Sequence, residues 1–135
     1  MTNVVIADHH ELFSLGAAEV LDAAQGFRVV GKAKSAAELI RTLEEVEAHV
    51  LILSASFLPI YPQIQRTLVE RAIGLLLLAD EHDQTAYEQW LGVRGIVYRS
   101  MNERAFIHAV RRVARNNGFE DKHGSDAKDE TSEVA

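Results

Sequence analysis

The chain has 135 residues, which is enough for one hydrophobic core but too few for two comfortable domains. Its composition, 47% hydrophobic and 25% charged, is typical of a soluble globular protein. The net charge of −6 disfavours broad nucleic-acid affinity, and the lack of cysteine excludes disulfides, thiolate zinc sites and thiol catalysis. Because we find no apolar stretch near the ~18 residues of a membrane span and no targeting signal, we expect a cytoplasmic protein without a membrane partner.

In chain order, short apolar runs alternate with segments whose apolar residues recur at helical spacing. The runs predict strands at 3–7, 27–33, 50–54, 73–79 and 95–98. Helices are predicted at 10–24, after a capping box of Ser35 and Glu38, at 63–71, at 83–91, and from a second capping box of Ser100 and Glu103 to Gly118. Continuously apolar strands joined by helices are typical of a parallel sheet covered on both faces. The sequence therefore predicts an α/β fold, a doubly wound (βα)5 three-layer sandwich with a five-stranded parallel sheet.

The charge is distributed unevenly along the chain. From Glu120 onward there are six acidic residues against two lysines, so the last sixteen residues carry a net charge of −4. This segment has almost no large apolar side chains, which is typical of disorder. We therefore expect one domain over residues 1–118, followed by a disordered acidic tail or the start of a linker at 119–135.

Several segments carry a resemblance to a known family. They are "VVIADHHELFSLGAAEVL", "FRVVGKAKSAAELI", "HVLILS", a loop ending in Pro59, and "LGVRGIVYRSMNERAFIHAVRRVARNN". Together they resemble the receiver domain of two-component response regulators, of the NarL/FixJ type that precedes a LuxR-like helix-turn-helix, over residues 3–117. The resemblance implies a CheY/flavodoxin-like fold and a place in phosphorelay signal transduction and transcription regulation. It also implies dimers formed through the first and last helices.

The resemblance further implies a site at the carboxyl ends of the strands. In the family, two acids hold Mg²⁺, a central aspartate accepts the phosphoryl group, and a hydroxyl and a lysine contact the phosphoryl oxygens. The residues at or beside those positions here are Asp8, His9, Ser54, Ala55, Leu78, Ala79 and Arg99. Asp8 matches the first acid, whereas the second acid, the acceptor, the hydroxyl and the lysine have all been replaced.

These replacements remove the chemistry that the family performs. An acyl phosphate needs a carboxylate nucleophile, which neither Ser54 nor Ala55 supplies. Mg²⁺ prefers carboxylate oxygens, so we expect no tightly bound Mg²⁺ and no other cofactor. Arg99 keeps the positive charge of the lysine as a planar fork on a longer arm. We therefore expect a degenerate pseudo-receiver, not an enzyme, which acts through contacts with a protein partner or a second copy.

Three other interpretations are a transition-metal site, a small-molecule or metal sensor, and a stand-alone adaptor. The run Asp8, His9, His10 and Glu11 offers nitrogen and oxygen ligands for a transition metal, but consecutive residues rarely converge on one ion, and we expect none. We favour instead that Asp8 caps the following helix and pairs with Arg99. The alternatives to a pseudo-receiver are a small-molecule or metal sensor that uses the altered acidic pocket, and a stand-alone adaptor.

The candidates for a protein interface are aromatic and basic residues: Tyr87, Trp90, Tyr98, Arg111 and Arg112. The resemblance places the aromatics on the surface formed by the fourth helix, the fifth strand and the fifth helix, although a role in the core is equally consistent with them. Because the chain is acidic, we expect contact with DNA only through a helix-turn-helix domain, which is absent from this sequence.

Overall fold

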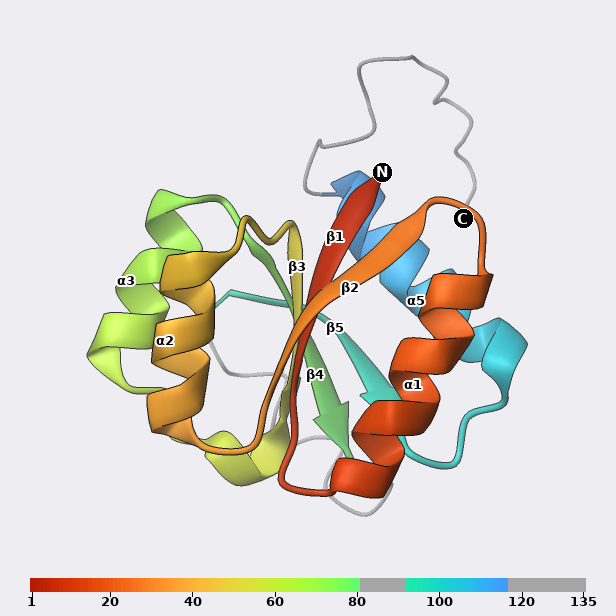
Figure 1. The fold of residues 1–135 in the computed structure, drawn as a ribbon, viewed down its shortest axis with the longest axis horizontal. Coiled ribbons are helices and arrows are strands. Elements are labelled where there is room, and N and C mark those ends of the chain that lie inside the picture. The colour runs from red at the N-terminus through yellow and green to blue at the C-terminus, as the bar shows by residue number, and fades with distance from the viewer. Residues whose placement is uncertain (81–91, 117–135) are drawn as a thin grey trace.

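The computed structural model describes residues 1–80 and 92–116 of the chain. Five parallel strands form one sheet in the order β2-β1-β3-β4-β5 (Figure 1). The strands are β1 (Thr2–Ala7), β2 (Phe27–Ala33), β3 (Val50–Ser54), β4 (Gly74–Ala79) and β5 (Val93–Tyr98). The order reverses direction beside β1, as in a doubly wound sheet. The predicted fold class is confirmed.

The described helices cover both faces of the sheet. The helices α1 (Glu11–Ala23) and α5 (Glu103–Asn116) lie on one face, to the right in Figure 1. The helices α2 (Ala36–Glu45) and α3 (Pro62–Glu70) lie on the other face. A short 3₁₀ helix, η1 (Ala55–Phe57), follows β3 directly. The predicted helix at 83–91, the stop at Gly118 and the tail lie outside the described residues.

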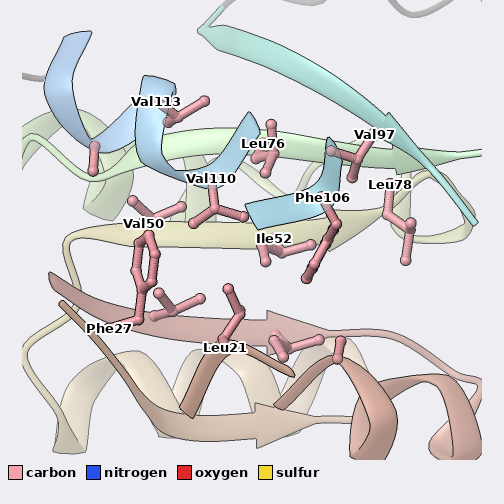
Figure 2. Packing of buried hydrophobic residues seen from close by; sticks show 14 of the residues in the cluster. Leu21, Phe27, Val50, Ile52, Leu76, Leu78, Val97, Phe106, Val110 and Val113 are labelled. Atoms are coloured by element: carbon pink, nitrogen blue, oxygen red, sulfur yellow. The ribbon is translucent and has the colours of Figure 1, made fainter. Parts of the chain in front are cut away.

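Each face of the sheet has its own hydrophobic core, because successive side chains of a strand point to opposite faces. Val4 and Ile6 of β1 face α1 and α5, whereas Val5 and Ala7 face α2 and α3. Figure 2 shows the first core, in which Leu21 of α1 and side chains of α5 meet the strands. Its labelled members are Leu21, Phe27, Val50, Ile52, Leu76, Leu78, Val97, Phe106, Val110 and Val113. The continuous apolar runs of β3 and β4 are explained by burial on both faces.

One of the two predicted capping boxes is present. The Ser35 hydroxyl accepts a hydrogen bond of 3.1 Å from the backbone N–H of Glu38, and α2 begins at Ala36. The other prediction, a cap at Ser100, is wrong. Asn102 is the cap of α5, since its side-chain oxygen accepts from the Ala105 N–H at 2.8 Å. The turn closed by the Met101 N–H and the Tyr98 carbonyl delays the start of the helix.

Two strands contain a glycine where the backbone passes close to a neighbour. A Cβ atom added to Gly31 of β2 would lie 2.6 Å from the Thr42 methyl group of α2. A Cβ added to Gly95 of β5 would lie 3.0 Å from Leu76 of β4. The lack of a side chain at these glycines therefore lets α2 pack close to β2 and β4 pack close to β5. The strand β5 also begins two residues earlier than predicted, at Val93.

Candidate functional site

Three strands deliver polar side chains to one edge of the sheet. Asp8 follows β1, Ser54 ends β3, and Arg99 follows β5. Because the strands are parallel, their carboxyl ends meet at the same edge, and β1 and β3 are neighbours beside the reversal in strand order. The side chains of residues separated by 91 positions in the sequence are thereby brought into direct contact. We call this group the Asp8–Arg99 site.

The centre of the site is a bidentate ion pair. Arg99 donates from Nη1 to Asp8 Oδ2 and from Nη2 to Asp8 Oδ1, both at 2.8 Å. The Asp8 side chain is fully buried, and the Arg99 side chain keeps 25% of its surface exposed. Two parallel charge-assisted hydrogen bonds of this length are the strongest arrangement that an arginine and a carboxylate form. The pairing predicted between these residues is confirmed.

The pKa values of the pair follow from this geometry. Burial alone raises the pKa of Asp8, but the hydrogen bonds from Arg99, together with the backbone N–H and side chain of His10, lower it below its ordinary value of 3.8. The hydrogen bond to Asp8 raises the pKa of Arg99, although burial opposes this. Both groups are therefore charged at neutral pH, and each neutralises the other.

Arg99 makes three further contacts around the pair. Its Nη2 lies 3.4 Å from the Ser54 hydroxyl, and its Nε lies 3.8 Å from the exposed carboxylate of Asp80. Its guanidinium carbon lies 5.0 Å from the centre of the Phe13 ring of α1, within the range of a cation–π contact. Arg99 therefore connects the ends of β1, β3, β4 and β5 and the first turn of α1.

The two histidines of the predicted cluster point to different partners. His10 Nδ1 lies 3.3 Å from Asp8 Oδ1, at the rim of the site. His9 stacks on Phe57 of η1, with ring centres 4.5 Å apart and planes inclined by 10°. The residue at the position of the second acid therefore packs on an aromatic ring. Among the residues that the structure describes, no three metal-binding side chains are close enough together to hold an ion.

Asp8 does not cap α1 in the way we predicted. The helix begins at Glu11 and its N-cap residue is His10, whose side chain makes no capping hydrogen bond. Asp8 instead accepts from the backbone N–H of His10, two residues along the chain. Both oxygens of its carboxylate accept hydrogen bonds from Arg99, so the side chain is directed towards Arg99 and not towards the first turn of α1. The prediction of a cap is corrected to a turn contact before the helix.

The remaining positions of the predicted site carry no acidic or exposed reactive group. Ser54 is 2% exposed, and its hydroxyl lies 2.8 Å from that of Ser56. Ala55 is the first residue of η1, immediately beyond the strand. Leu78 and Ala79 are 1% and 2% exposed at the end of β4, where Leu78 pairs in register with Ser54. The strand next to Ser54 therefore carries the apolar side chains of Leu78 and Ala79 at the positions where a hydroxyl was expected.

No protein-family model matches the chain, and no curated protein matches it. Solved structures do match. The signal receiver domain of the putative response regulator NarL from Mycobacterium tuberculosis has a TM-score of 0.68 and 22% identity, over 84% of this chain and 96% of that one. The fold is that of a receiver domain.

Two further structures show the same likeness. RcsB from Salmonella enterica, bound to promoter rprA, has a TM-score of 0.71 and 22% identity, over 86% of this chain and 63% of that one. A complex of the phosphorylated P1 domain of CheA3 with CheY6 from R. sphaeroides gives a TM-score of 0.65 and 19% identity, over 84% and 97% of the two chains. At these identities the comparison establishes the receiver fold, and the chemistry has to be argued from this chain's own residues.

The predicted interface residues are only partly described. Tyr87 and Trp90 lie outside the described residues. Tyr98 is half-buried at the end of β5. Arg111 is engaged within the chain, because it donates to the Gln25 carbonyl at 2.9 Å and lies 5.1 Å above the Phe27 ring. Arg112 is exposed on α5 and remains a candidate.

Two kinds of residue were not predicted from the sequence. Asp80 contacts the site from the segment after β4, and Phe57 contacts it from the end of η1. No pattern in the sequence marked either residue. Leu12 and Leu15 of α1 are 84% and 50% exposed, which is unusual for side chains of this size. Leu12 lies on the helix face opposite Leu21, and Leu15 lies at the margin of the buried side of the helix. Their place outside the buried positions of the helix was a signal that would have found them. None of the described helices is both long and apolar enough to cross a membrane.

Proposed function

We propose that this chain is a pseudo-receiver, a signalling domain with the receiver fold that acts through protein contacts and without phosphorylation of an aspartate. The observation that carries the proposal is the bidentate pair of Arg99 and Asp8. The guanidinium binds both oxygens of the carboxylate that the family uses to hold Mg²⁺. A divalent cation would have to displace two charge-assisted hydrogen bonds before it could bind this carboxylate.

The second support is the lack of a nucleophile beside the pair. Attack on a phosphoryl donor to give an acyl phosphate requires a carboxylate, and the strand end here presents the Ser54 hydroxyl. That hydroxyl accepts a hydrogen bond from the Ser56 N–H at 3.2 Å and lies beside the positive charge of Arg99. No described histidine contacts Ser54 to act as a base. The site therefore favours a structural role for these residues over a catalytic one.

The geometry also favours an interaction domain over a small-molecule sensor. A sensor of that kind would use Asp8 and Arg99 as polar anchors for its ligand. In the structure each anchor is bonded to the other, and the Asp8 carboxylate is closed to solvent. A ligand would have to break the pair before it could bind, which makes this alternative weaker.

Incubation with acetyl phosphate and Mg²⁺, followed by intact mass spectrometry, tests the proposal. We expect no mass increase in this chain under conditions in which a phosphorylatable receiver domain, treated in parallel, gains one phosphoryl group. A gain of one phosphoryl group that is lost in a Ser54→Ala variant would make Ser54 the acceptor and would contradict the structural role assigned to it. A gain that persists in that variant would contradict the proposal.

For the partner we propose a second copy of the chain, held through α1. Leu12 and Leu15 present an exposed apolar surface on the helix that the resemblance assigns to dimers, and α1 lies beside α5 on one face of the sheet. Contact with DNA is assigned within this proposal to a separate helix-turn-helix domain. RcsB, of which this chain covers 63%, is one matched structure that is bound to a promoter.

Sedimentation velocity over a range of concentrations tests the dimer. We expect the double variant Leu12→Glu and Leu15→Glu to sediment as a monomer at concentrations where the unmodified chain is dimeric. The matched control is Val69→Glu, because Val69 of α3 is also apolar and 71% exposed but lies on the opposite face of the sheet. The proposal fails if the α3 variant dissociates the dimer and the α1 variant leaves it intact.

A further inference from the structure

A row of basic side chains runs along the outer face of α5. The residues Arg104, His108, Arg112 and Arg115 are all exposed and recur at spacings of four, four and three. This spacing places them on one side of the helix, opposite the buried residues Phe106, Val110, Val113 and Ala114. Over 103–116 there are four arginines and one acidic residue, Glu103. We call these four residues the α5 basic face.

The charges of this face are uncompensated within the described part of the chain. Its four ion pairs involve Asp8, Glu11 and Asp80 as acids, and none includes Arg104, Arg112 or Arg115. The contrast with Arg111 of the same helix is clear, since that side chain is bonded to a carbonyl and packed on a ring. An exposed row of three arginines and a histidine is therefore available for an acidic ligand.

The chain itself carries a strongly acidic segment in the sequence that follows this helix. Between Glu120 and Glu133 there are six acidic residues and only two lysines. The two segments have opposite charge, although the protein as a whole is acidic with a net charge of −6. Charge complementarity and proximity in the sequence therefore make this segment the best-matched occupant for the α5 basic face.

We propose that the acidic segment 120–133 docks on the α5 basic face of the same molecule. The reach is sufficient: from Arg115 back to Arg104 is about 16 Å along the helix axis, which an extended chain covers in about five residues. Three residues separate Asn116, at the end of α5, from Glu120. A linker this short gives an effective concentration on the order of millimolar, so that weak pairwise attractions suffice for docking.

The docked segment has a regulatory consequence that does not depend on the function proposed above. It covers the basic surface and keeps other polyanions away from it. An acidic protein partner or a nucleic acid has to displace the segment before it can bind α5. The attraction is electrostatic, so it weakens as salt shortens the range of the interaction, to ~3 Å in about 1 M salt.

Paramagnetic relaxation in the full chain tests the proposal. Because the chain has no cysteine, Ser132→Cys gives a single site for a nitroxide label. We expect the label to broaden the amide signals of residues 104–115 more than those of α2 and α3, which lie across the sheet. The broadening should disappear in about 1 M salt and in a labelled chain whose six tail acids are changed to their amides.

Two variants that lose the same number of charges distinguish docking on the α5 basic face from an effect of the net charge of the chain. The first changes Arg104, Arg112 and Arg115 to Gln and should abolish the broadening. The second makes the same change at three exposed arginines outside α5, namely Arg28, Arg41 and Arg66, and should preserve it. Equal loss in both variants would overturn the proposal, and so would an absence of preferential broadening on α5.

The last comparison distinguishes a docked tail from a second copy. In a mixture, the isotope label is placed on one chain and the nitroxide on another. Intramolecular docking gives weak broadening in this mixture and strong broadening when both labels are on one chain. Broadening of equal strength in the two samples would mean that the tail binds another molecule, and would refute intramolecular docking.

Discussion

Replacing Arg99 with alanine removes both hydrogen bonds that neutralise the buried carboxylate of Asp8. A hydrogen bond to a charged group contributes about 1.5–3 kcal/mol, and breaking a buried ion pair by removing one partner costs about 3–5 kcal/mol. A quarter of the Arg99 side chain is exposed, so water reaches the vacated space and offsets part of the loss. We expect the free energy of unfolding to fall by about 3 kcal/mol at neutral pH.

The pH dependence of this loss identifies its cause. In the unmodified chain the pKa of Asp8 lies below 3.8, so its contribution to stability is complete above that pH and disappears as the pH falls through the folded-state pKa. In Arg99→Ala, burial is no longer opposed by the guanidinium and should raise the pKa of Asp8. The variant therefore recovers part of its deficit on acidification, because protonation removes the uncompensated charge.

Urea denaturation followed by far-UV circular dichroism, at about pH 7 and about pH 4, measures both effects. Arg66→Ala is the control, because Arg66 is an exposed arginine of α3 with no ion pair among the described residues, and it should change stability by less than about 0.5 kcal/mol. Arg99→Lys should be intermediate, since an ammonium keeps the charge without the planar fork. An equal loss at both pH values would refute the electrostatic reasoning and assign the effect to packing on Phe13.

Three smaller perturbations test other contacts. Burial lowers the pKa of His49 below 6.5, against an opposing effect of Glu47, and its Nδ1 accepts from the backbone N–H of Asn3 at 2.8 Å. As the pH falls, the imidazole of His49 is therefore protonated in the unfolded chain before it is protonated in the folded chain, and the free energy of unfolding should decline below pH 6.5. Urea denaturation should show a smaller decline over this pH range in His49→Gln. Gly31→Ala should cost about 1–3 kcal/mol, and adding Thr42→Ser, which removes the methyl group it meets, should restore part of this in thermal unfolding. Asn102→Ala should cost about 1 kcal/mol in thermal unfolding through loss of the α5 cap.

The parts of the fold that the sequence predicted are those encoded locally. The runs 27–33 and 50–54 match β2 and β3 residue for residue. The apolar stretch of β3, bounded by polar residues, is hard to place anywhere except inside the sheet. The pairing of Asp8 with Arg99 was also predictable, since parallel strands bring their carboxyl ends to one edge. Opposite charges at two such ends are expected to meet there.

The errors concern choices that tertiary contacts decide. Ser100 with Glu103 fits the capping-box pattern, but the turn after β5 places Asn102 at the start of the helix, and local pattern alone could not choose between them. The stacking of His9 on Phe57 joins the turn before α1 to η1, and the relative position of these two segments depends on the whole sheet. The sequence showed that His9 stands in place of the second acid, but it did not show that His9 packs on the ring of Phe57.

The guanidinium that fills the Asp8–Arg99 site has a consequence for how the cell would use such a domain. A receiver that accepts a phosphoryl group has two populations, and a signal changes their ratio. The guanidinium of Arg99 is part of the chain and is present in every copy, so the charge of this site does not change with a signal. On the proposed function, the output of the protein is then governed by the number of copies and by what competes for their surfaces. Control would pass from chemical modification of the domain to its synthesis and degradation.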